Sequence, residues 1–166
     1  MRLPRESRRI EILLPIAVVA ADQISKAVVR SKLPLYASRT VIPGFMDFTH
    51  VPNDGIAYGL LQNVNFPFKT VLIALIAAAA MISVGVYAAK VATNQLVARI
   101  GLALIIGGAA GNLIDRIVAG SVVDFVDVYW RTYHFWVFNV ADSAISVGVV
   151  VMILDMLGSA HVSKTA

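Results

Sequence analysis

Four long apolar segments constrain this chain more than any other feature of its sequence. They cover residues 10–29, 68–89, 97–116 and 137–158 of the 166. About 20 apolar residues in a helix cross the hydrocarbon core of a bilayer. Hydrophobic residues make up 58% of the chain and charged residues 14%, against about 45–50% and about 25% in soluble domains. The sequence therefore predicts one integral membrane domain, residues 1–166, mainly α-helical, with four transmembrane helices.

Two longer connections of mixed polarity join the first segment to the second and the third to the fourth. They cover residues 30–67 and 117–136. Residues 45–51 roughly alternate between apolar and polar side chains, as in a half-buried strand. The run Pro-Asn-Asp-Gly that follows is a strong turn signal. We therefore expect strands at 45–51, at 56–61 and within 121–135.

A basic cluster at the N-terminus predicts how the segments are oriented. Four arginines lie within the first nine residues, and basic residues are enriched on the cytoplasmic side of membrane proteins. An even number of spans places both termini on one side. We therefore expect both termini in the cytoplasm and residues 30–67 and 117–136 outside it. The alternative is a cleaved signal peptide with its cut site at 18–20, but the helical pattern continues to Arg30.

Polar side chains within the segments gather at one membrane face under this topology. From Val71 to Ala89 the second segment carries only Ser83 as a polar side chain. Ionisable groups within spans are energetically costly and usually mark a functional site. The side chains at this face are those of Asp22, Lys26, Asn112, Asp115, Arg116, Asn139 and Asp142, with Asp124 in the adjoining connection. The sequence therefore predicts a site near the extracytoplasmic surface.

The residue types exclude several kinds of site. The chain has no cysteine, which excludes disulfides, thiolate metal sites and a cysteine nucleophile. Its three histidines are scattered, so no His-Glu-x-x-His zinc motif occurs. A serine-hydrolase elbow and a P-loop are also absent. We expect no metal and no cofactor. Basic residues that flank the spans explain the net charge of +4, so we also expect no nucleic-acid partner.

Paired aspartates could hydrolyse a peptide bond. Two carboxylates held close together share one proton. The ionised one takes a proton from water, and the protonated one donates to the carbonyl oxygen and then helps the amine to leave. Three alternatives remain open at this point. They are an ion or proton carrier, which needs polar groups across the whole bilayer, a Ser/Lys peptidase, and an assembly factor without enzymatic activity.

Five motifs occur in order along the chain, and together they resemble one family. They are Asp-Gln-Ile-Ser-Lys at 22–26, Asn-Asp-Gly-Ile-Ala-Tyr-Gly at 53–59, Gly-Gly-Ala-Ala-Gly-Asn-Leu-Ile-Asp-Arg at 107–116, Val-Val-Asp-Phe at 122–125 and Phe-Asn-Val-Ala-Asp at 138–142. The chain resembles the lipoprotein signal peptidases, the type II signal peptidases of bacteria, over nearly its full length. One departure is Asp54-Gly-Ile-Ala-Tyr58, where the family usually has Thr-Gly-Ala-Ala followed by Phe or Trp.

The resemblance implies an activity and a place in the cell. It implies a globomycin-sensitive aspartyl endopeptidase of the bacterial inner membrane, and a monomer. Such an enzyme removes the signal peptide from diacylglyceryl-modified prolipoproteins by cutting before the lipidated cysteine, and its partners are this substrate and membrane lipid. The catalytic pair carries over as Asp124 and Asp142. The resemblance also assigns a small extracytoplasmic β-cradle to residues 34–62 and 120–135.

The other polar motif residues are expected to support the site. Asn112 and Asn139 would hydrogen-bond substrate or steer the aspartates, and Arg116 would pair with Asp115 or bind a substrate carbonyl. Asp22 and Lys26 are spaced for an ion pair, with a structural role as plausible as a functional one. The remaining candidates are Asn53 and Gly55 on a loop over the site, Gly108 in a glycine run suited to helix packing, Val122 and Ala141.

Residues outside the motifs are expected to be peripheral. Asp127 is interpreted as an exposed loop carboxylate. The aromatic residues of 129–136 are interpreted as anchors at the membrane surface. Surface positions are expected for Asp47, Asp54, His50 and His134, and a position near the inner end of the last span for Asp155.

Overall fold

The computed structural model describes residues 5–55, 64, 66–92 and 94–162. Within them lie four long helices, α1 (Arg5–Lys32), α2 (Lys69–Lys90), α3 (Leu96–Ala119) and α4 (Val140–Val162). Each is long and apolar enough to cross a membrane, which confirms the four predicted spans. The strand expected at 56–61 lies outside the described residues.

Helix α4 begins three residues later than the apolar pattern predicted. The backbone of Phe138 is paired with the backbone of Val126 in both directions, at 2.8 and 3.1 Å. Residues 137–139 are therefore extended along a strand, and the helix starts at Val140. Hydropathy alone cannot mark this boundary because Val137 and Phe138 are as apolar as the helix that follows.

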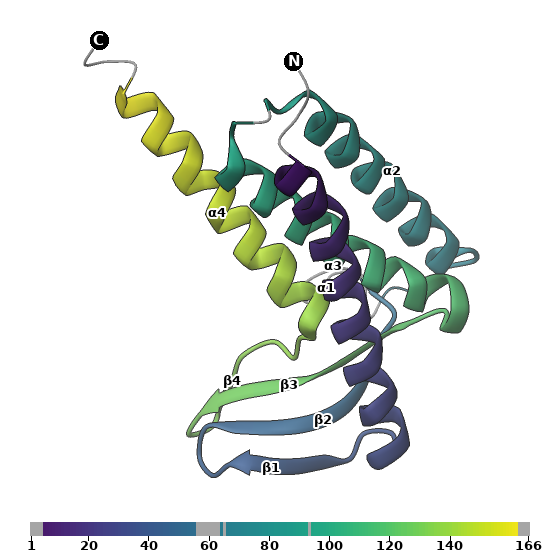
Figure 1. The fold of residues 1–166 in the computed structure, drawn as a ribbon. Helices are drawn as coiled ribbons and strands as arrows, with labels where there is room; N and C mark the ends of the chain where they lie inside the picture. The colour runs from purple at the N-terminus through teal and green to yellow at the C-terminus, as the bar shows by residue number, and fades with distance from the viewer. Residues whose placement is uncertain (1–4, 56–63, 65, 93, 163–166) are drawn as a thin grey trace.

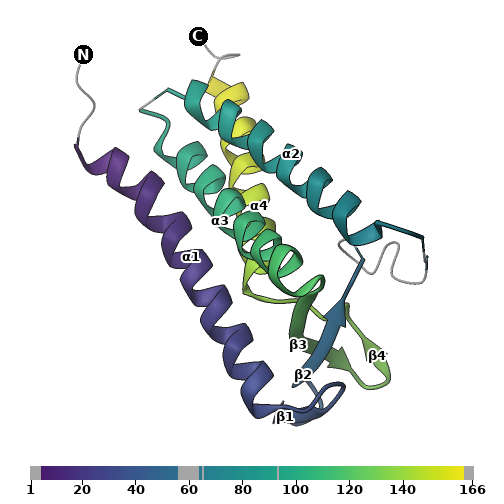
Figure 2. The ribbon, with the colours of Figure 1, turned by 90° about the vertical axis from the view of Figure 1, so that its right-hand side faces the viewer.

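Helix α3 lies at the centre of the bundle, with α1, α2 and α4 around it (Figure 2). Half of its apolar window is buried, compared with 6% for α2. Its glycines permit this packing, since a Cβ at Gly108 would lie 2.4 Å from the carbonyl oxygen of Ala141, and one at Gly107 would lie 2.8 Å from Val18 Cβ. The glycine run therefore serves close helix contact, as predicted.

A small antiparallel sheet lies at one end of the bundle, away from the first turn of α1 and the last turn of α4 (Figure 1). Its strands occur in the order β1-β2-β3-β4. They are β1 (Ser38–Ile42), β2 (Met46–Asn53), β3 (Val122–Trp130) and β4 (Tyr133–His134). Strands β2 and β3 confirm the predictions at 45–51 and within 121–135. The first strand was not predicted from its pattern, because all its residues are exposed and carry no burial period.

The sheet register fixes which residues reach the helices. Strand β2 pairs with β3 so that Val51 lies opposite Asp124 and Asn53 opposite Val122. An apolar cluster of Val29, Val123 and Phe125 joins α1 to β3. The sheet is therefore attached to the helix ends along the segment that carries Asp124.

Candidate active site

Two aspartates from separate elements are brought together where β3 approaches α4. Asp124 lies in β3 and is 4% exposed, and Asp142 lies in the first turn of α4 and is half-buried. Asn139 contacts both of them. Its Nδ2 donates to Asp124 Oδ1 at 2.7 Å, and its backbone N–H donates to Asp142 Oδ2 at 3.2 Å. One residue thus holds the two acids predicted to be catalytic.

Asn139 and Asp142 form a reciprocal cap at the start of α4. The backbone N–H of Asp142 donates to Asn139 Oδ1 at 2.9 Å, while Asp142 accepts from the backbone N–H of Asn139. This arrangement satisfies two backbone donors that a helix N-terminus otherwise leaves unpaired. A carboxylate is also favoured there by the helix dipole. The spacing of three residues therefore fixes the Asp142 carboxyl group in place.

Burial raises the pKa of Asp124 to about 7, with a further contribution from repulsion by the nearby charge of Asp142. Donors on Asn53 and Asn139 act in the opposite direction. Asn53 Nδ2 lies 2.8 Å from Asp124 Oδ2. A carboxyl group with a pKa near 7 carries a proton for much of the time at neutral pH. The pair can therefore hold one proton, as general acid–base hydrolysis requires.

Asn53 is the last residue of β2, so its expected position on a loop was wrong, and Gly55 just after the strand is bonded to α3. Asn53 Oδ1 accepts from the backbone N–H of Gly55 at 2.9 Å. Arg116 Nη2 donates to the carbonyl oxygen of Gly55 at 3.1 Å, and its Nη1 to the carbonyl oxygen of Asn112 at 3.3 Å. Arg116 does not pair with Asp115, whose ion pairs are with Lys26 and Arg30, so the first of its two expected roles was wrong. Successive residues on a helix point about 100° apart, and these two side chains point to different neighbours.

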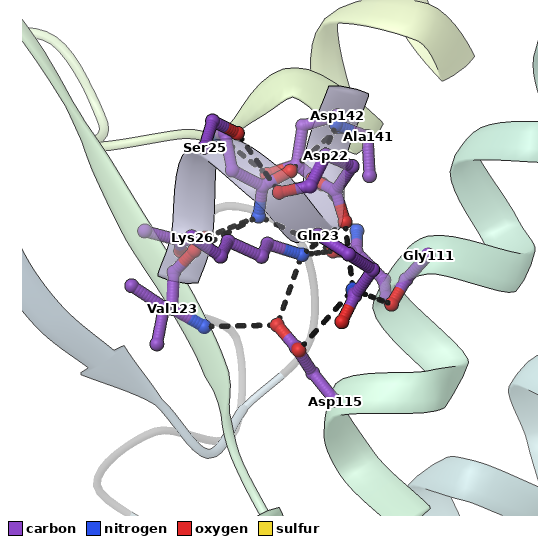
Figure 3. Close-up of polar contacts among 12 residues, drawn as sticks. Asp22, Gln23, Ser25, Lys26, Gly111, Asp115, Val123, Ala141 and Asp142 are labelled. Carbon is purple, nitrogen blue, oxygen red and sulfur yellow. Dashed lines mark hydrogen bonds and ion pairs between the residues drawn. The ribbon is translucent and has the colours of Figure 1, made fainter. Parts of the chain in front are cut away.

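A second cluster of charged residues lies close to the start of α4, which carries Asp142 (Figure 3). Lys26 Nζ donates to Asp22 at 2.7 Å and to Asp115 at 2.9 Å, and all three side chains are at most 2% exposed. Arg30 Nη2 lies 3.0 Å from the other oxygen of Asp115. The ion pair predicted between Asp22 and Lys26 is confirmed. Asp115 joins α3 to α1 and also accepts from the backbone N–H of Val123.

Asn112 lies between the charged cluster and the aspartate pair. Its Oδ1 accepts from Lys26 Nζ at 2.9 Å and from Asn139 Nδ2 at 3.2 Å. Its Nδ2 donates to Asp142 Oδ1 at 2.8 Å. Both asparagines that were expected to steer the aspartates therefore contact them directly.

Three further candidates contribute by packing. Val122 is 1% exposed and Ala141 is 0% exposed. A side chain at Gly108 would collide with the backbone of Ala141. These positions allow β3, α3 and α4 to converge on the aspartates.

Two residues of the charged cluster were missed by the sequence analysis. Gln23 Nε2 donates to the carbonyl oxygen of Gly111 at 3.1 Å and to Asp115 at 3.3 Å, and Arg30 binds Asp115. Arg30 follows Asp22 and Lys26 at a spacing of four residues. Residues spaced by four lie on one face of a helix, so this spacing could have identified Arg30 as a member of the cluster.

Several residues expected to be peripheral have partners. Asp127 lies in a strand rather than a loop, is 14% exposed and binds His134 Nδ1 at 2.9 Å, so the loop interpretation was wrong. Asp47 accepts from the hydroxyl of Tyr129 at 3.2 Å. Polar partners also occur at His50, which bonds the carbonyl oxygen of Leu33, and at Asp54, which pairs with Lys69. None of these contacts joins the aspartate pair.

Metal ligation is not supported by the acids and histidines whose positions are described. Among those residues, no three come together in a way that could hold a metal ion. The aspartate pair is instead surrounded by side-chain amides and by the cations of Lys26 and Arg116. The amides position the carboxylates and supply hydrogen-bond donors to them.

Comparisons with known proteins agree with this geometry. The family model described as signal peptidase (SPase) II matches residues 14–158. A lipoprotein signal peptidase of Geobacter metallireducens is 40% identical over 149 residues, which cover 90% of this chain and 91% of that protein. One of Listeria monocytogenes is 40% identical over 142 residues, covering 86% and 89%.

Two solved structures of bacterial membrane enzymes, determined by the in meso method, share the fold. One has a TM-score of 0.80 and 31% identity, covering 90% of this chain and 88% of its own, and the other has 0.79 and 30%, covering 89% and 92%. The chain is therefore a multi-pass membrane protease that belongs to the signal peptidase II family.

Proposed function

We propose that this protein is an aspartyl endopeptidase that removes the signal peptide from diacylglyceryl-modified prolipoproteins, cutting immediately before the lipidated cysteine. The observation that carries the proposal is the aspartate pair. Asp124 and Asp142 come from separate elements, are joined through Asn139, and have no cation bonded directly to either carboxylate among the described contacts. Membership of the signal peptidase II family supports the substrate class.

The two acids have different roles in the proposed reaction. Asp124 holds the proton, because its pKa lies near 7. Asp142 is the base, because it is the remaining carboxyl group of the pair once Asp124 holds the proton. Asp142 takes a proton from water, whose oxygen attacks the carbonyl carbon, while Asp124 protonates the carbonyl oxygen. The resulting diol collapses as the Asp124 carboxylate takes back a proton from one of its hydroxyl groups, the carbon–nitrogen bond breaks, and the proton held on Asp142 passes to the leaving amine.

Neighbouring residues hold this pair and its substrate. Asn112 and Asn139 orient the carboxyl groups. Asn53, Gly55 and Arg116 form one side of the site, where the guanidinium group of Arg116 also lies within reach of a substrate carbonyl oxygen. Gly108, Val122 and Ala141 shape the site by packing, and Asp22, Lys26 and Asp115 support the helix ends around it.

The proposed setting is the bacterial inner membrane. We place both termini in the cytoplasm, residues 30–67 and 117–136 outside it, and the aspartate pair near the outer surface, with residues 1–166 as one monomeric domain. Apolar side chains such as Leu75 and Leu157 are more than 60% exposed on the helices. Such exposure suits contact with lipid rather than water.

An ion or proton carrier is the alternative from another functional class. Polar groups do occur near the other end of the bundle, where Arg99 pairs with Glu11. Between this pair and the charged cluster, however, α3 carries only apolar residues and glycines over 100–111, and α1 only apolar residues over 12–21. A relay across the bilayer would need polar side chains or water at that depth, so hydrolysis is favoured.

The test is cleavage of a lipidated prolipoprotein by purified protein, with the cut located by mass spectrometry. We expect a product that begins at the diacylglyceryl cysteine and inhibition by globomycin. The same substrate lacking its diacylglyceryl group should remain uncut. Asp124→Asn and Asp142→Asn should each lower the rate at least about 1,000-fold, and full activity in either variant would reject the pair.

A further inference from the structure

Lys26 is buried, and its ammonium group has three N–H donors. All three are used. Two donate to carboxylate oxygens of Asp22 and Asp115, at 2.7 and 2.9 Å, and the third donates to Asn112 Oδ1 at 2.9 Å. The side chain is 0% exposed, so water does not compete for these bonds. The bond to Asp22 lies within α1, whereas the bonds to Asp115 and Asn112 both join α1 to α3. Of these three acceptors, Asn112 is the one that also contacts the aspartate pair.

The third donor determines which way the amide of Asn112 faces. With its oxygen towards Lys26, Asn112 presents its NH₂ group to Asp142 Oδ1 at 2.8 Å. If the amide were turned over, the NH₂ group would face the ammonium donors, and the carbonyl oxygen would face a carboxylate. Both contacts would then be repulsive. The ammonium group therefore favours the single orientation in which Asn112 donates to Asp142.

The same contacts extend to the other aspartate. Asn112 Oδ1 also accepts from Asn139 Nδ2, which donates to Asp124 Oδ1 at 2.7 Å. In addition, Asp22 Oδ1 accepts from the backbone N–H of Ala141 at 3.0 Å, next to Asp142 in the first turn of α4. The ion pair of α1 is thus bonded both to the amide that orients Asp142 and to the helix that carries it.

We propose that Lys26 is a positioning residue for the aspartate pair, acting through the side-chain amide of Asn112. The inference rests on the proposed peptidase function and adds a role for a buried cation that touches neither aspartate in the described contacts. It predicts that Lys26 contributes to the rate of the chemical step rather than to substrate binding. A purely structural role would change the amount of folded protein and leave the turnover of the folded fraction unchanged.

The test is a double-mutant cycle measured on folded protein in detergent. Lys26→Met removes the ammonium group at similar length, and Asn112→Ala removes the amide. We expect each to lower kcat about 10- to 100-fold, as a displaced catalytic group does, with KM within about 2-fold of wild type. If Lys26 acts through Asn112, the double variant should be within about 3-fold of the slower single variant.

The matched control is Arg30→Met. Arg30 binds the same carboxylate of Asp115 as Lys26 does, but it has no contact with Asn112 in the described structure. This variant should unfold at a lower temperature and keep the kcat of the wild type. A loss of kcat equal to that of Lys26→Met would overturn the inference, because the shared carboxylate rather than Asn112 would then transmit the effect.

A second variant covers the case in which Lys26→Met does not fold. Asp22→Asn combined with Lys26→Met removes the cation together with one partner, leaves Asp115 paired with Arg30, and keeps an acceptor for the N–H of Ala141. It should show the same loss of kcat as Lys26→Met alone.

Independent effects of the Lys26 and Asn112 substitutions on kcat would also contradict the inference. If the kcat losses of Lys26→Met and Asn112→Ala multiply in the double variant, Lys26 does not act through Asn112, and wild-type kcat in folded Lys26→Met would exclude any positioning role. The wild-type enzyme separates the two proposals. If it does not cleave the prolipoprotein, the proposed function has failed, whereas cleavage by wild type with unaffected Lys26 variants rejects only the positioning role.

Discussion

Two neighbouring clusters in this protein contain the same acidic residue type, yet their partners differ in kind. Asp22 and Asp115 are bonded to Lys26 and, at Asp115, also to Arg30. Asp124 and Asp142 are bonded to the amides of Asn53, Asn112 and Asn139. Cations are bonded to the first pair, whereas amides orient the second pair, whose carboxylates have no directly bonded cation among the described contacts. The comparison suggests one rule for testing, in which acids bonded to cations stabilise the fold and acids bonded to amides form the proposed catalytic pair.

The largest effect on stability is expected in the charged cluster. Asp115→Asn removes the carboxylate that Lys26 and Arg30 share in a site 2% exposed. Removing one partner of a buried ion pair leaves the other charge uncompensated, which costs about 3–5 kcal/mol. Thermal unfolding in detergent should therefore occur at a clearly lower temperature than for wild type. Unchanged unfolding would show that the cluster does not stabilise the fold, and loss of cleavage in a fully folded variant would assign Asp115 to the chemistry.

Replacing Asp124 by Asn is expected to raise the stability of the fold, whereas Asp115→Asn should lower it. The pKa of Asp124 is about 7 in the folded chain and 3.8 as the ordinary value, so the folded chain retains a proton that the unfolded chain releases between these pH values. Stability therefore falls as the pH rises from about 4 to 7. Asp124→Asn removes this loss and should stabilise the protein at pH 8 by about 1–3 kcal/mol, with a smaller gain at pH 5. Destabilisation that grows with pH would contradict the assignment.

The pH dependence of cleavage should report the proton on Asp124. Activity should fall above about pH 7, where Asp124 loses the proton that it donates. Asn53→Ala removes a hydrogen-bond donor that favours the ionised form of Asp124, so the pKa of Asp124 should rise. The fall of activity on the alkaline side should therefore move to higher pH by about 0.5–1 pH unit. The measurement is kcat/KM against pH for both proteins, and a downward shift in the variant would show that another group controls this fall of activity.

The smallest effect is expected at an acid that belongs to neither cluster. Asp127 binds His134 on the strand edge, and such partly exposed pairs contribute about 0–1 kcal/mol. Asp127→Asn should keep the cleavage rate within about 2-fold and change the unfolding temperature little. A large loss of activity would show that the reactive region extends along β3 beyond Asp124.

The sequence predicted the parts of the structure that depend on local pattern. The lengths of the apolar segments predicted the four spans, and the alternation of apolar and polar side chains predicted β2. The resemblance of the five motifs to one family pointed to Asp124 and Asp142 as a pair. The partners of Asp115 and Arg116 were not predictable in this way, because adjacent positions on one helix point to different elements. Strand β1 carries no burial pattern, and the start of α4 depends on the pairing of Phe138 with Val126. These features are determined by contacts between distant segments, which a single sequence does not display.

The most direct test of the difference between the clusters is to measure cleavage and unfolding on one preparation of Asp124→Asn at pH 8. The account predicts no detectable cleavage of the lipidated prolipoprotein by a protein that unfolds at the same temperature as wild type or higher. Cleavage at the wild-type rate would contradict it, because the carboxyl group of Asp124 would then be dispensable for the reaction.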